Sequence, residues 1–431
     1  MSSLADRLRG VIGQSGPKGP PLRDDEDGAL DRRGGPSGPP DAAEILGGEW
    51  RESRGRKFLV VDRKYSPGYR HGRVSIADCL PPWPRLELLG GSAGSERTRP
   101  ALHSERILFL DLETTGLAGG AGTYAFLVGC GWFEPPSPKA SAGQAGVCFR
   151  TRQFFLSDFA AERALLESVA AVADDADCLV TYNGKTFDLP LIETRFALQR
   201  MPPPFADVAH VDMLHPARRM WREDAVECRL TYLEQAFCGH EREGDVPGFE
   251  IPSRYFHYVR SGDARPLAAV LEHNRLDIVS LAMLTARASQ LLDEGPSAAT
   301  TEREAFGMGR LYERAGLLDR ALACFHRVKN VEGYRASAIL LRRLRRYGEA
   351  ADAWRELLAT RGCPAGYARE AMEALAVHHE HRARDLEAAR RFALQSLRLQ
   401  ATAARQDAMK YRLARLDRKL GSQTLPCLPL A

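Results

Sequence analysis

The stretch Ile107-Leu-Phe-Leu-Asp111-Leu-Glu113 decides the fold of this chain. Its apolar residues run without interruption up to an acidic residue, which is typical of a central strand buried on both faces of a sheet. Because side chains alternate along a strand, Asp111 and Glu113 should leave the same face near the strand's end. The stretch therefore predicts a core strand that presents two carboxylates together.

The residues that follow this strand predict an α/β domain. The Gly-rich segment 116–122 should turn the chain, and Asp158 should cap a helix. Further strands are expected at 124–133, 152–156 and 178–182, and a second helix at 189–199. The order of three strands, a helix, a strand and a helix indicates a mixed central sheet with flanking helices.

Two later motifs supply further carboxylates. Asp188 ends the motif Asn183-Gly-Lys-Thr-Phe-Asp188, which follows a predicted strand, so a loop can bring it over the sheet. His273 and Asp277 lie four residues apart in a segment of helical apolar spacing, so both point the same way. Taken singly, such motifs are usually solvated surface. If they converge, a site for two Mg²⁺ or Mn²⁺ ions results, with the ligands Asp111, Glu113, Asp188 and Asp277.

The order and context of the three motifs resemble those of a known family. Asp-x-Glu after a buried strand, Asn-x-x-x-Phe-Asp after a second strand and His-x-x-x-Asp in a late helix resemble the motifs of the DEDD 3′→5′ exonucleases, which have a ribonuclease H-like fold. Residues 115–129, 181–190 and 273–282 are more closely similar to the bacterial YprB-type ribonuclease H-like exonuclease domain proteins. The resemblance covers about residues 50–290, and a helical-repeat tail is also common in that group.

This resemblance implies a mechanism and a set of site residues. The four carboxylates would hold two divalent ions about 3.5–4 Å apart, and hydrolysis would proceed in line at phosphorus. His273 would be the general base, although it stands four residues before the last Asp, whereas five is usual in the subgroup that uses histidine. The alternative is that His273 only orients Asp277 or contacts phosphate.

Residues next to the carboxylates are candidates for substrate contact. Thr114, Thr115 and Leu117 follow Glu113 directly, and they are placed to meet the terminal nucleotide through backbone groups and an apolar wedge. Asn183 and Phe187 could line the same cleft. Turn chemistry and core packing explain each of these residues equally well.

The last third of the chain predicts a separate helical domain. After the linker 293–300 the sequence is helical throughout, and three pairs each place a small residue and an aromatic one turn apart: Ala321 and Phe325, Ala350 and Trp354, Ala388 and Phe392. Each pair should lie in the second helix of a hairpin. This resembles tetratricopeptide-type repeats, although the offsets of 29 and 38 residues straddle the regular period of about 34. An irregular helical bundle is the alternative.

The composition, the motifs and the linker together divide the chain into four expected regions. Residues 1–46 should be a disordered leader rich in Gly and Pro, and 47–100 an N-terminal extension with an edge hairpin formed by 58–62 and 74–77. The ribonuclease H-like domain should span 101–293 and the tetratricopeptide-like domain 294–431.

The charge is distributed unevenly along the chain. Residues 301–431 contain 25 Lys and Arg against 15 Asp and Glu, a net charge of +10, so the remainder carries −6 of the total of +4. A basic module beside an acidic enzyme domain suits a polyanionic substrate, and Arg218, Arg219 and Arg222 could meet phosphates. A solvated, Arg-rich helical surface without a binding role explains the charge equally well.

Cysteines and hydropathy indicate the compartment. The nine cysteines include no C-x-x-C pair, which argues against a disulfide framework and a structural zinc site and favours a reducing compartment. No stretch of about 18 consecutive apolar residues occurs, so we expect a soluble, cytoplasmic protein without a membrane partner.

Three further segments carry alternatives. His210, Asp212 and His215 could suggest a metal cluster, but a short strand with a helix cap at Asp212 is simpler. Segment 245–252 should be an extended loop over the cleft. Aromatic residues after it could stack bases or pack in the core: Tyr255, Phe256 and Tyr258.

Together these features predict a metal-dependent nuclease, a 3′→5′ exonuclease acting on single-stranded ends and fused to a helical-repeat module that could bind a protein partner. The alternatives are a scaffold that binds nucleic acid or protein through a vestigial nuclease fold, and a structure-selective endonuclease. DNA and RNA both remain open as the substrate, because contacts to the 2′-hydroxyl decide this.

Overall fold

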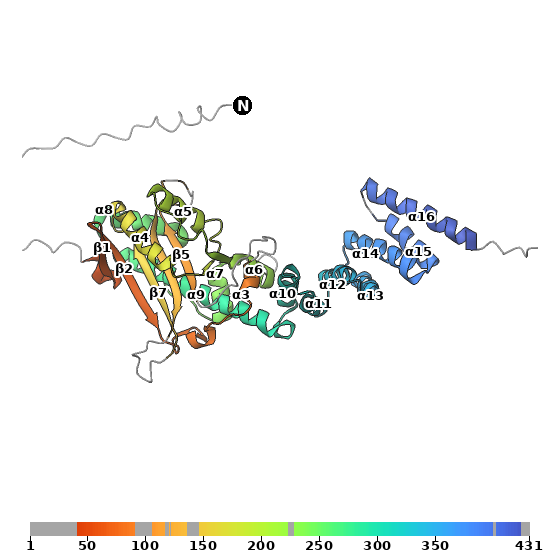
Figure 1. Cartoon of the computed structure of the whole chain (residues 1–431), viewed down its shortest axis with the longest axis horizontal. Coiled ribbons are helices and arrows are strands. Elements are labelled where there is room, and N and C mark those ends of the chain that lie inside the picture. The colour runs from red at the N-terminus through yellow and green to blue at the C-terminus, as the bar shows by residue number, and fades with distance from the viewer. Residues whose placement is uncertain are drawn as a thin grey trace, which may run out of the picture. The chain divides into compact units, whose positions relative to one another are not determined.

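The computed structural model describes residues 41–90, 106–116, 120, 122–135, 146–222, 228–399 and 402–423. Within them, a seven-stranded sheet flanked by helices is followed by a helical region (Figure 1). Residues 1–40 of the predicted leader lie outside the described residues, but Ala42–Leu46 form helix α2 where the sequence predicted disorder. Asp41 explains the difference, because its carboxylate accepts hydrogen bonds from the Ala43 amide and the Trp50 indole, which fix the start of the helix.

The central sheet is mixed, as predicted. Its strand order is β1-β2-β7-β6-β5-β8-β9, in which β5, β8 and β9 are parallel and the other neighbours antiparallel. The strands span Glu49–Ser53 (β1), Arg56–Tyr65 (β2), Ile107–Thr114 (β5), Ala125–Glu134 (β6), Cys148–Phe155 (β7), Cys178–Thr181 (β8) and Ala209–Asp212 (β9). The stretch that begins at Ile107 thus forms β5, in the interior of the sheet.

The predicted edge hairpin is wrong in its pairing. Residues 58–62 belong to β2, whose hairpin partner is β1, and not 74–77. Arg70–His71 (β3) and Val74–Ser75 (β4) pair only with each other. The sequence did not predict β1 because the strand is polar and largely exposed, so it lacks an apolar signal.

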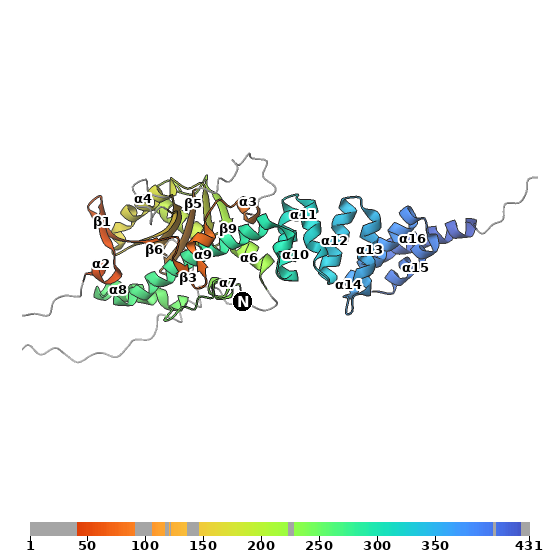
Figure 2. The same cartoon turned by 90° about the horizontal axis from the view of Figure 1, so that it is seen from below.

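The two faces of β5 pack against different helices. Leu108 and Leu110 face the core that contains Leu165 of α4 (Glu162–Ala173) and Phe196 of α5 (Asp188–Leu198). Phe109 faces the other core, which contains Ile278 of α9 (Ala268–Glu294). Because side chains alternate along a strand, Asp111 and Glu113 share the face of Phe109, toward α9. Figure 2 shows α9 running along the sheet.

Two glycines of β6 let α9 (Ala268–Glu294) approach the sheet closely. A Cβ atom on Gly129 would lie 2.2 Å from the Asn274 side chain, and one on Gly131 would lie 2.4 Å from Ile278. Gly129 is also the register partner of Asp111. The bare backbone at Gly129 therefore sets how close the helix comes to the carboxylate strand.

The remaining helices of the first domain surround these layers. They are α3 (Leu86–Leu89), α6 (Leu214–Met220), α7 (Leu230–Cys238) and α8 (Ile251–Ser261). In the part of the chain that the structure describes, no helix is both long enough and apolar enough to span a membrane.

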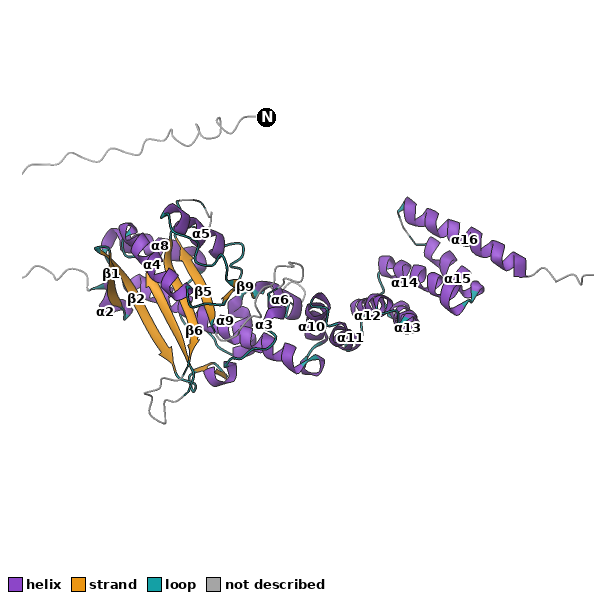
Figure 3. Ribbon diagram, in the orientation of Figure 1, coloured by secondary structure: helices purple, strands orange, loops and turns teal. Residues whose placement is uncertain are grey.

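The C-terminal region is helical, as predicted (Figure 3). Its helices are Glu302–Arg314 (α10), Leu318–His326 (α11), Val331–Arg343 (α12), Tyr347–Ala359 (α13), Ala365–His378 (α14), Leu386–Leu397 (α15) and Ala403–Gln423 (α16). The small and aromatic pairs fall in α11, α13 and α15, the second helices of successive pairs, where Ala321, Phe325 and Trp354 are buried. Whether the array is of the tetratricopeptide type stays a prediction.

Candidate functional site

Asp111 and Glu113 lie at the carboxyl end of β5. Both side chains are partly buried, and the ladder with β6 shifts register between Glu113 and Thr114. The irregularity ends the regular pairing just after the two carboxylates, at a place where such shifts commonly redirect side chains. β5 therefore holds the pair on a fixed backbone at the end of the sheet where this strand finishes.

The loop after β8 brings Asp188 to the same end of the sheet. The amides of Asn183 and Lys185 donate to the Asp212 carboxylate at 2.7 and 3.1 Å, and the amide of Leu214 donates to it at 3.1 Å. Asp212 thus fixes the loop that leads to α5 at Asp188 and also binds the first amide of α6. The predicted strand is confirmed as β9, whereas the N-cap of α6 is Met213 and not Asp212, because the chain continues for one more residue before the helix begins.

Helix α9 contributes His273, Asn274 and Asp277. The Asn274 amide donates to the Asp111 carboxylate at 2.7 Å, and Gln153 of β7 donates to the Asn274 carbonyl oxygen at 2.8 Å. The sequence analysis missed Asn274 and Gln153, although Gly129 and Gly131 in a buried strand signal a close helix contact. These amides join the helix to the carboxylate strand.

Arg242 is a third residue that the sequence analysis missed. Its guanidinium donates to Asp277 at 2.5 Å and to Glu234 of α7 at 2.6 Å, and it lies 3.7 Å from Asp245. The Arg242 side chain is only 5% exposed, so its charge acts in a poorly solvated place. Because it lies in an irregular segment with charged neighbours in sequence, no periodicity could have assigned it to the site.

His273 is held by a second acidic group. Its Nδ1 lies 2.6 Å from the Asp245 carboxylate, and its Nε2 lies 3.7 Å from Asp277. When Nδ1 carries the proton and donates it to Asp245, the lone pair of Nε2 is free on the side of Asp277. Asp245 therefore orients the ring that was predicted to be the general base.

The electrostatics of the site are those of crowded, buried carboxylates. Burial raises the pKa of Asp111 well above its usual value, and the charges of Asp277, Glu113 and Asp188 raise it further. The pKa of Glu113 is raised in the same way, by burial and then by Asp277 and Asp188. Burial raises the pKa of Asp188 to about 7. The negative charges of the four predicted ligands therefore act on one another, and a bound cation would reduce their repulsion.

The oxygens of these carboxylates are not gathered around a single point. Among the described residues, the set of three potential ligands whose atoms all lie within 4.8 Å of one another is His71, Glu234 and His240. That set is better explained as a hydrogen-bond network. The His71 and His240 rings are stacked, with centroids 4.0 Å apart, and Glu234 already binds His71 at 2.6 Å and the cationic Arg242. Both oxygens of the Glu234 carboxylate are therefore already occupied, one by His71 and Ser280 and the other by Arg242.

The predicted substrate contacts form turns at the rim of the site. The Thr115 hydroxyl accepts from the Tyr124 amide at 2.9 Å, and the Thr114 hydroxyl donates to the Gly116 carbonyl. Asn183 has a left-handed backbone with φ of 68°, and Phe187 is 57% exposed. Leu117 lies outside the described residues.

One expectation about the neighbouring segment needs correction, and one alternative is decided. Segment 245–252 is not extended to its end, because a 3₁₀ turn at Gly248–Glu250 leads into α8 at Ile251. Tyr255 and Tyr258 are buried in the core, where Tyr255 stacks on Phe126 and Tyr258 meets Phe155 edge to face, which is the packing alternative of the sequence analysis. Packing wins because both rings lie on the apolar face of α8.

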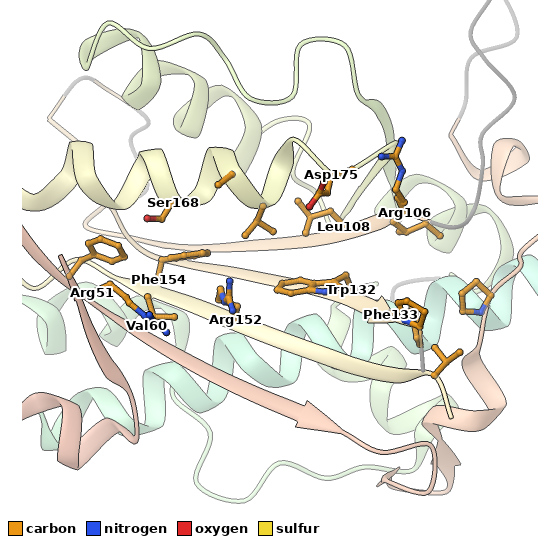
Figure 4. Close-up of a pocket in the computed structure, with 18 of the residues that line it drawn as sticks. Arg51, Val60, Arg106, Leu108, Trp132, Phe133, Arg152, Phe154, Ser168 and Asp175 are labelled. Atoms are coloured by element: carbon orange, nitrogen blue, oxygen red, sulfur yellow. The ribbon is translucent and has the colours of Figure 1, made fainter. Parts of the chain in front are cut away.

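A separate hollow of about 1110 Å³ lies on the other side of the sheet. It is lined by Leu108, Trp132 and Phe154 of the sheet and by Ser168 of α4 (Figure 4). Leu108 and Asp111 leave opposite faces of β5, so this hollow does not belong to the carboxylate site.

The chain is similar to a known superfamily and to known proteins over large parts of its length. The RNase_H superfamily matches residues 108–289, a range that contains all four carboxylates. The uncharacterized protein YprB of Bacillus subtilis (strain 168) is 30% identical over 375 residues, which are 84% of this chain and 86% of YprB. Among solved structures, the family B DNA polymerase from the hyperthermophilic archaeon Pyrobaculum calidifontis matches 48% of this chain at 16% identity, with a TM-score of 0.31. The match spans 29% of that polymerase chain.

Proposed function

This chain belongs to the RNase_H superfamily and to the family of YprB, and from that premise we propose that it is a divalent-metal-dependent nuclease. It hydrolyses phosphodiester bonds and acts as a 3′→5′ exonuclease on single-stranded nucleic acid. The observation that carries the proposal is the mutual repulsion of Asp111, Glu113 and Asp188 at the end of β5 and the start of α5. Burial and neighbouring acids raise the pKa values of all three carboxylates.

The donor set fits Mg²⁺ or Mn²⁺. Carboxylate oxygens are hard ligands that suit both ions. Arg242 contacts Asp277 and lowers the pKa of Glu113, but burial and the neighbouring acids outweigh it and keep that pKa raised. Two bound ions would activate a water and stabilise the leaving 3′-oxygen. The proposed ligands are Asp111, Glu113, Asp188 and Asp277.

The protein's own groups would divide the remaining work. His273 would accept the proton of the attacking water at Nε2, because Asp245 keeps its Nδ1 protonated. Asn274 would keep Asp111 in position through its 2.7 Å hydrogen bond. Thr114, Thr115, Leu117, Asn183 and Phe187 remain proposed contacts of the terminal nucleotide.

A cleavage assay on three substrates tests this proposal. The full chain is incubated with 5′-labelled linear DNA, 5′-labelled linear RNA and circular single-stranded DNA, in Mg²⁺, in Mn²⁺ and in EDTA. We expect stepwise shortening from the 3′ end of a linear strand, with no cleavage of the circle and none in EDTA. Cutting of the circle would identify an endonuclease, and intact strands that still bind the protein would identify a scaffold.

A further inference from the structure

A cleft of about 280 Å³ lies where the ribonuclease H-like domain meets the helical region. Its lining residues come from α6 of the first domain and α10 of the second. Figure 2 shows these two helices side by side. Four of its six lining residues are arginines, and the lining consists of His215, Arg218, Arg219, Arg303, Phe306 and Arg310. Neither domain supplies this lining alone.

The two walls are fixed relative to each other by direct contacts. Gly307 of α10 lies so close to α6 that a Cβ atom there would be 2.4 Å from the Arg219 carbonyl oxygen. The Trp221 indole donates to Glu304 at 3.0 Å, and Arg303 donates to the Arg218 carbonyl at 3.1 Å. The cleft is therefore a built feature of the junction and not a chance gap between mobile surfaces.

The positive charge of the cleft is poorly compensated. Among the described residues, no carboxylate forms an ion pair with Arg218, Arg219 or Arg303, whereas Arg310 pairs with Glu313 at 2.9 Å. Nη1 of Arg219 and Nε of Arg303 are buried and have no hydrogen-bond partner within the described part of the chain. Burial and the charge of Arg219 also lower the pKa of nearby Arg314. Buried, unpaired guanidinium donors call for an anion.

Helix α9 connects the wall of the cleft to the carboxylate site. Ala217 of α6 packs against Leu284 of α9, which is seven residues beyond Asp277. Seven residues of helix correspond to about 10 Å. Nucleotides in a stacked strand are spaced about 3.4 Å apart, so a strand whose end lies at Asp277 needs more than about three nucleotides to reach the arginines.

We propose that this cleft binds the phosphodiester backbone of the substrate strand upstream of the nucleotide being removed. This inference rests on the proposed nuclease function for its substrate class. It assigns a role to the junction with the helical region, since α10 supplies half of the phosphate contacts. Arginine suits this task because its fork of donors matches phosphate oxygens.

Binding measurements test the cleft independently of cleavage. Fluorescence anisotropy of 20-nucleotide and 3-nucleotide DNA and RNA strands is measured in EDTA over 50–200 mM salt, with the full chain and the variants R218Q and R218Q/R219Q. We expect the double variant to bind the 20-mers about tenfold more weakly, with the salt slope reduced by about 1.4 if each lost phosphate contact contributes about 0.7. The loss should be confined to the long strands. R218Q, at an exposed position, should show about half of the reduction in slope.

The control is R342Q/R343Q, which removes two exposed arginines of α12 and the same amount of charge. Equal 20-mer affinity in R218Q/R219Q and this control would overturn the cleft, even if the wild type cleaves normally. Loss of binding in R218Q/R219Q alone supports the cleft even if no variant cleaves, so the two proposals fail separately. Tight binding of polyglutamate, with no binding of any strand, would overturn it in favour of an acidic protein partner. Melting temperatures show whether each variant is folded.

Discussion

Arg242 donates a hydrogen bond to Asp277 at 2.5 Å, so a buried cation already occupies one side of the carboxylate cluster. The same guanidinium is anchored by Glu234, whose carboxylate is bound by His71 and Ser280 at 2.6 and 2.7 Å. The hydrogen bonds of His71 and Arg242 outweigh the effect of burial and lower the pKa of Glu234, which therefore stays charged. Arg242 thus holds Asp277 and partly offsets the repulsion among the acids.

Replacing Arg242 should make the protein depend more strongly on a divalent cation. R242Q leaves Asp277 and Glu234 without a buried counter-charge, and we expect the free energy of unfolding in EDTA to fall by about 3 kcal/mol. Saturating Mn²⁺ should then raise the melting temperature by more in R242Q than in the wild type, because the ion replaces the missing charge. Equal increments in both proteins would show that Arg242 does not offset the cluster.

The matched control for this variant is R346Q. Arg346 forms an exposed pair with Glu349, and both side chains are more than 40% exposed. Exposed pairs contribute about 0–1 kcal/mol, so R346Q should change neither stability in EDTA nor the response to Mn²⁺.

Removing the charge of Asp111 should separate activity from stability. D111N loses a proposed ligand, so mononucleotide release should fall at least about 1000-fold, the scale of a lost electrostatic stabiliser. Burial and three neighbouring acids raise the pKa of Asp111, so a neutral amide relieves repulsion, and the melting temperature in EDTA should stay equal or rise.

D62N provides the comparison for D111N. Asp62 is paired with Arg152 at 2.8 Å in the opposite part of the sheet, and its loss removes an attraction and no repulsion. We expect normal cleavage and no rise in melting temperature for D62N. Wild-type cleavage by D111N would refute the assignment of Asp111 as a ligand.

Gly129 should be needed for the position of α9. In G129A the new methyl group lies 2.2 Å from the Asn274 carbonyl oxygen, so the helix has to shift away from β6. We expect a loss of about 1–3 kcal/mol in stability. Cleavage should fall by about 100-fold, because misplacement of catalytic groups by 1 Å has effects of that size. Gly348 is the control: a Cβ there meets nothing within 4 Å, so G348A should keep full activity.

His273 should affect the rate of the chemical step and not the binding of substrate. H273A is expected to lower kcat about 100-fold with little change in KM, while the Mn²⁺-induced rise in melting temperature persists. D245N, which replaces the carboxylate beside the ring by a neutral and weaker acceptor, should lower kcat by about tenfold. H257A removes an exposed imidazole of α8 and serves as the control. A kcat for H273A within threefold of the wild type would exclude His273 as the base.

What the sequence could predict follows from the range of the interactions involved. Strand alternation placed Asp111 and Glu113 on one face, and helical spacing placed His273 and Asp277 together, because both depend on neighbours in sequence. Arg242 escaped prediction because its contact with Asp277 joins an irregular segment to a helix 35 residues away. The exposed strand β1 carried no apolar pattern, so its pairing with β2 was equally hidden. These features depend on contacts between segments that are distant in sequence, and a single sequence contains no local pattern that reports such contacts.

Glu380 should hold the last helix of the chain. Its buried carboxylate accepts hydrogen bonds from Arg415 at 2.6 Å and Lys419 at 3.1 Å on α16, and it also pairs with Arg412. Burial opposes ionisation, but these cations outweigh it and lower the pKa of Glu380 from 4.5 to about 2. Because the folded-state pKa is depressed, the stabilisation is complete above about pH 4.5 and is lost as the pH falls toward 2.

E380Q should therefore destabilise the C-terminal helices by about 2 kcal/mol at pH 7, a value reduced by the partial exposure of Arg415 and Lys419. The difference in stability between E380Q and the wild type should shrink between pH 4.5 and pH 2. Circular dichroism melts across this range measure it. D417N, which removes an exposed partner of Arg390, is the control and should show a small difference at every pH. A difference for E380Q that is independent of pH would mean that Glu380 acts through packing alone, because only the ionised carboxylate can attract the three cations.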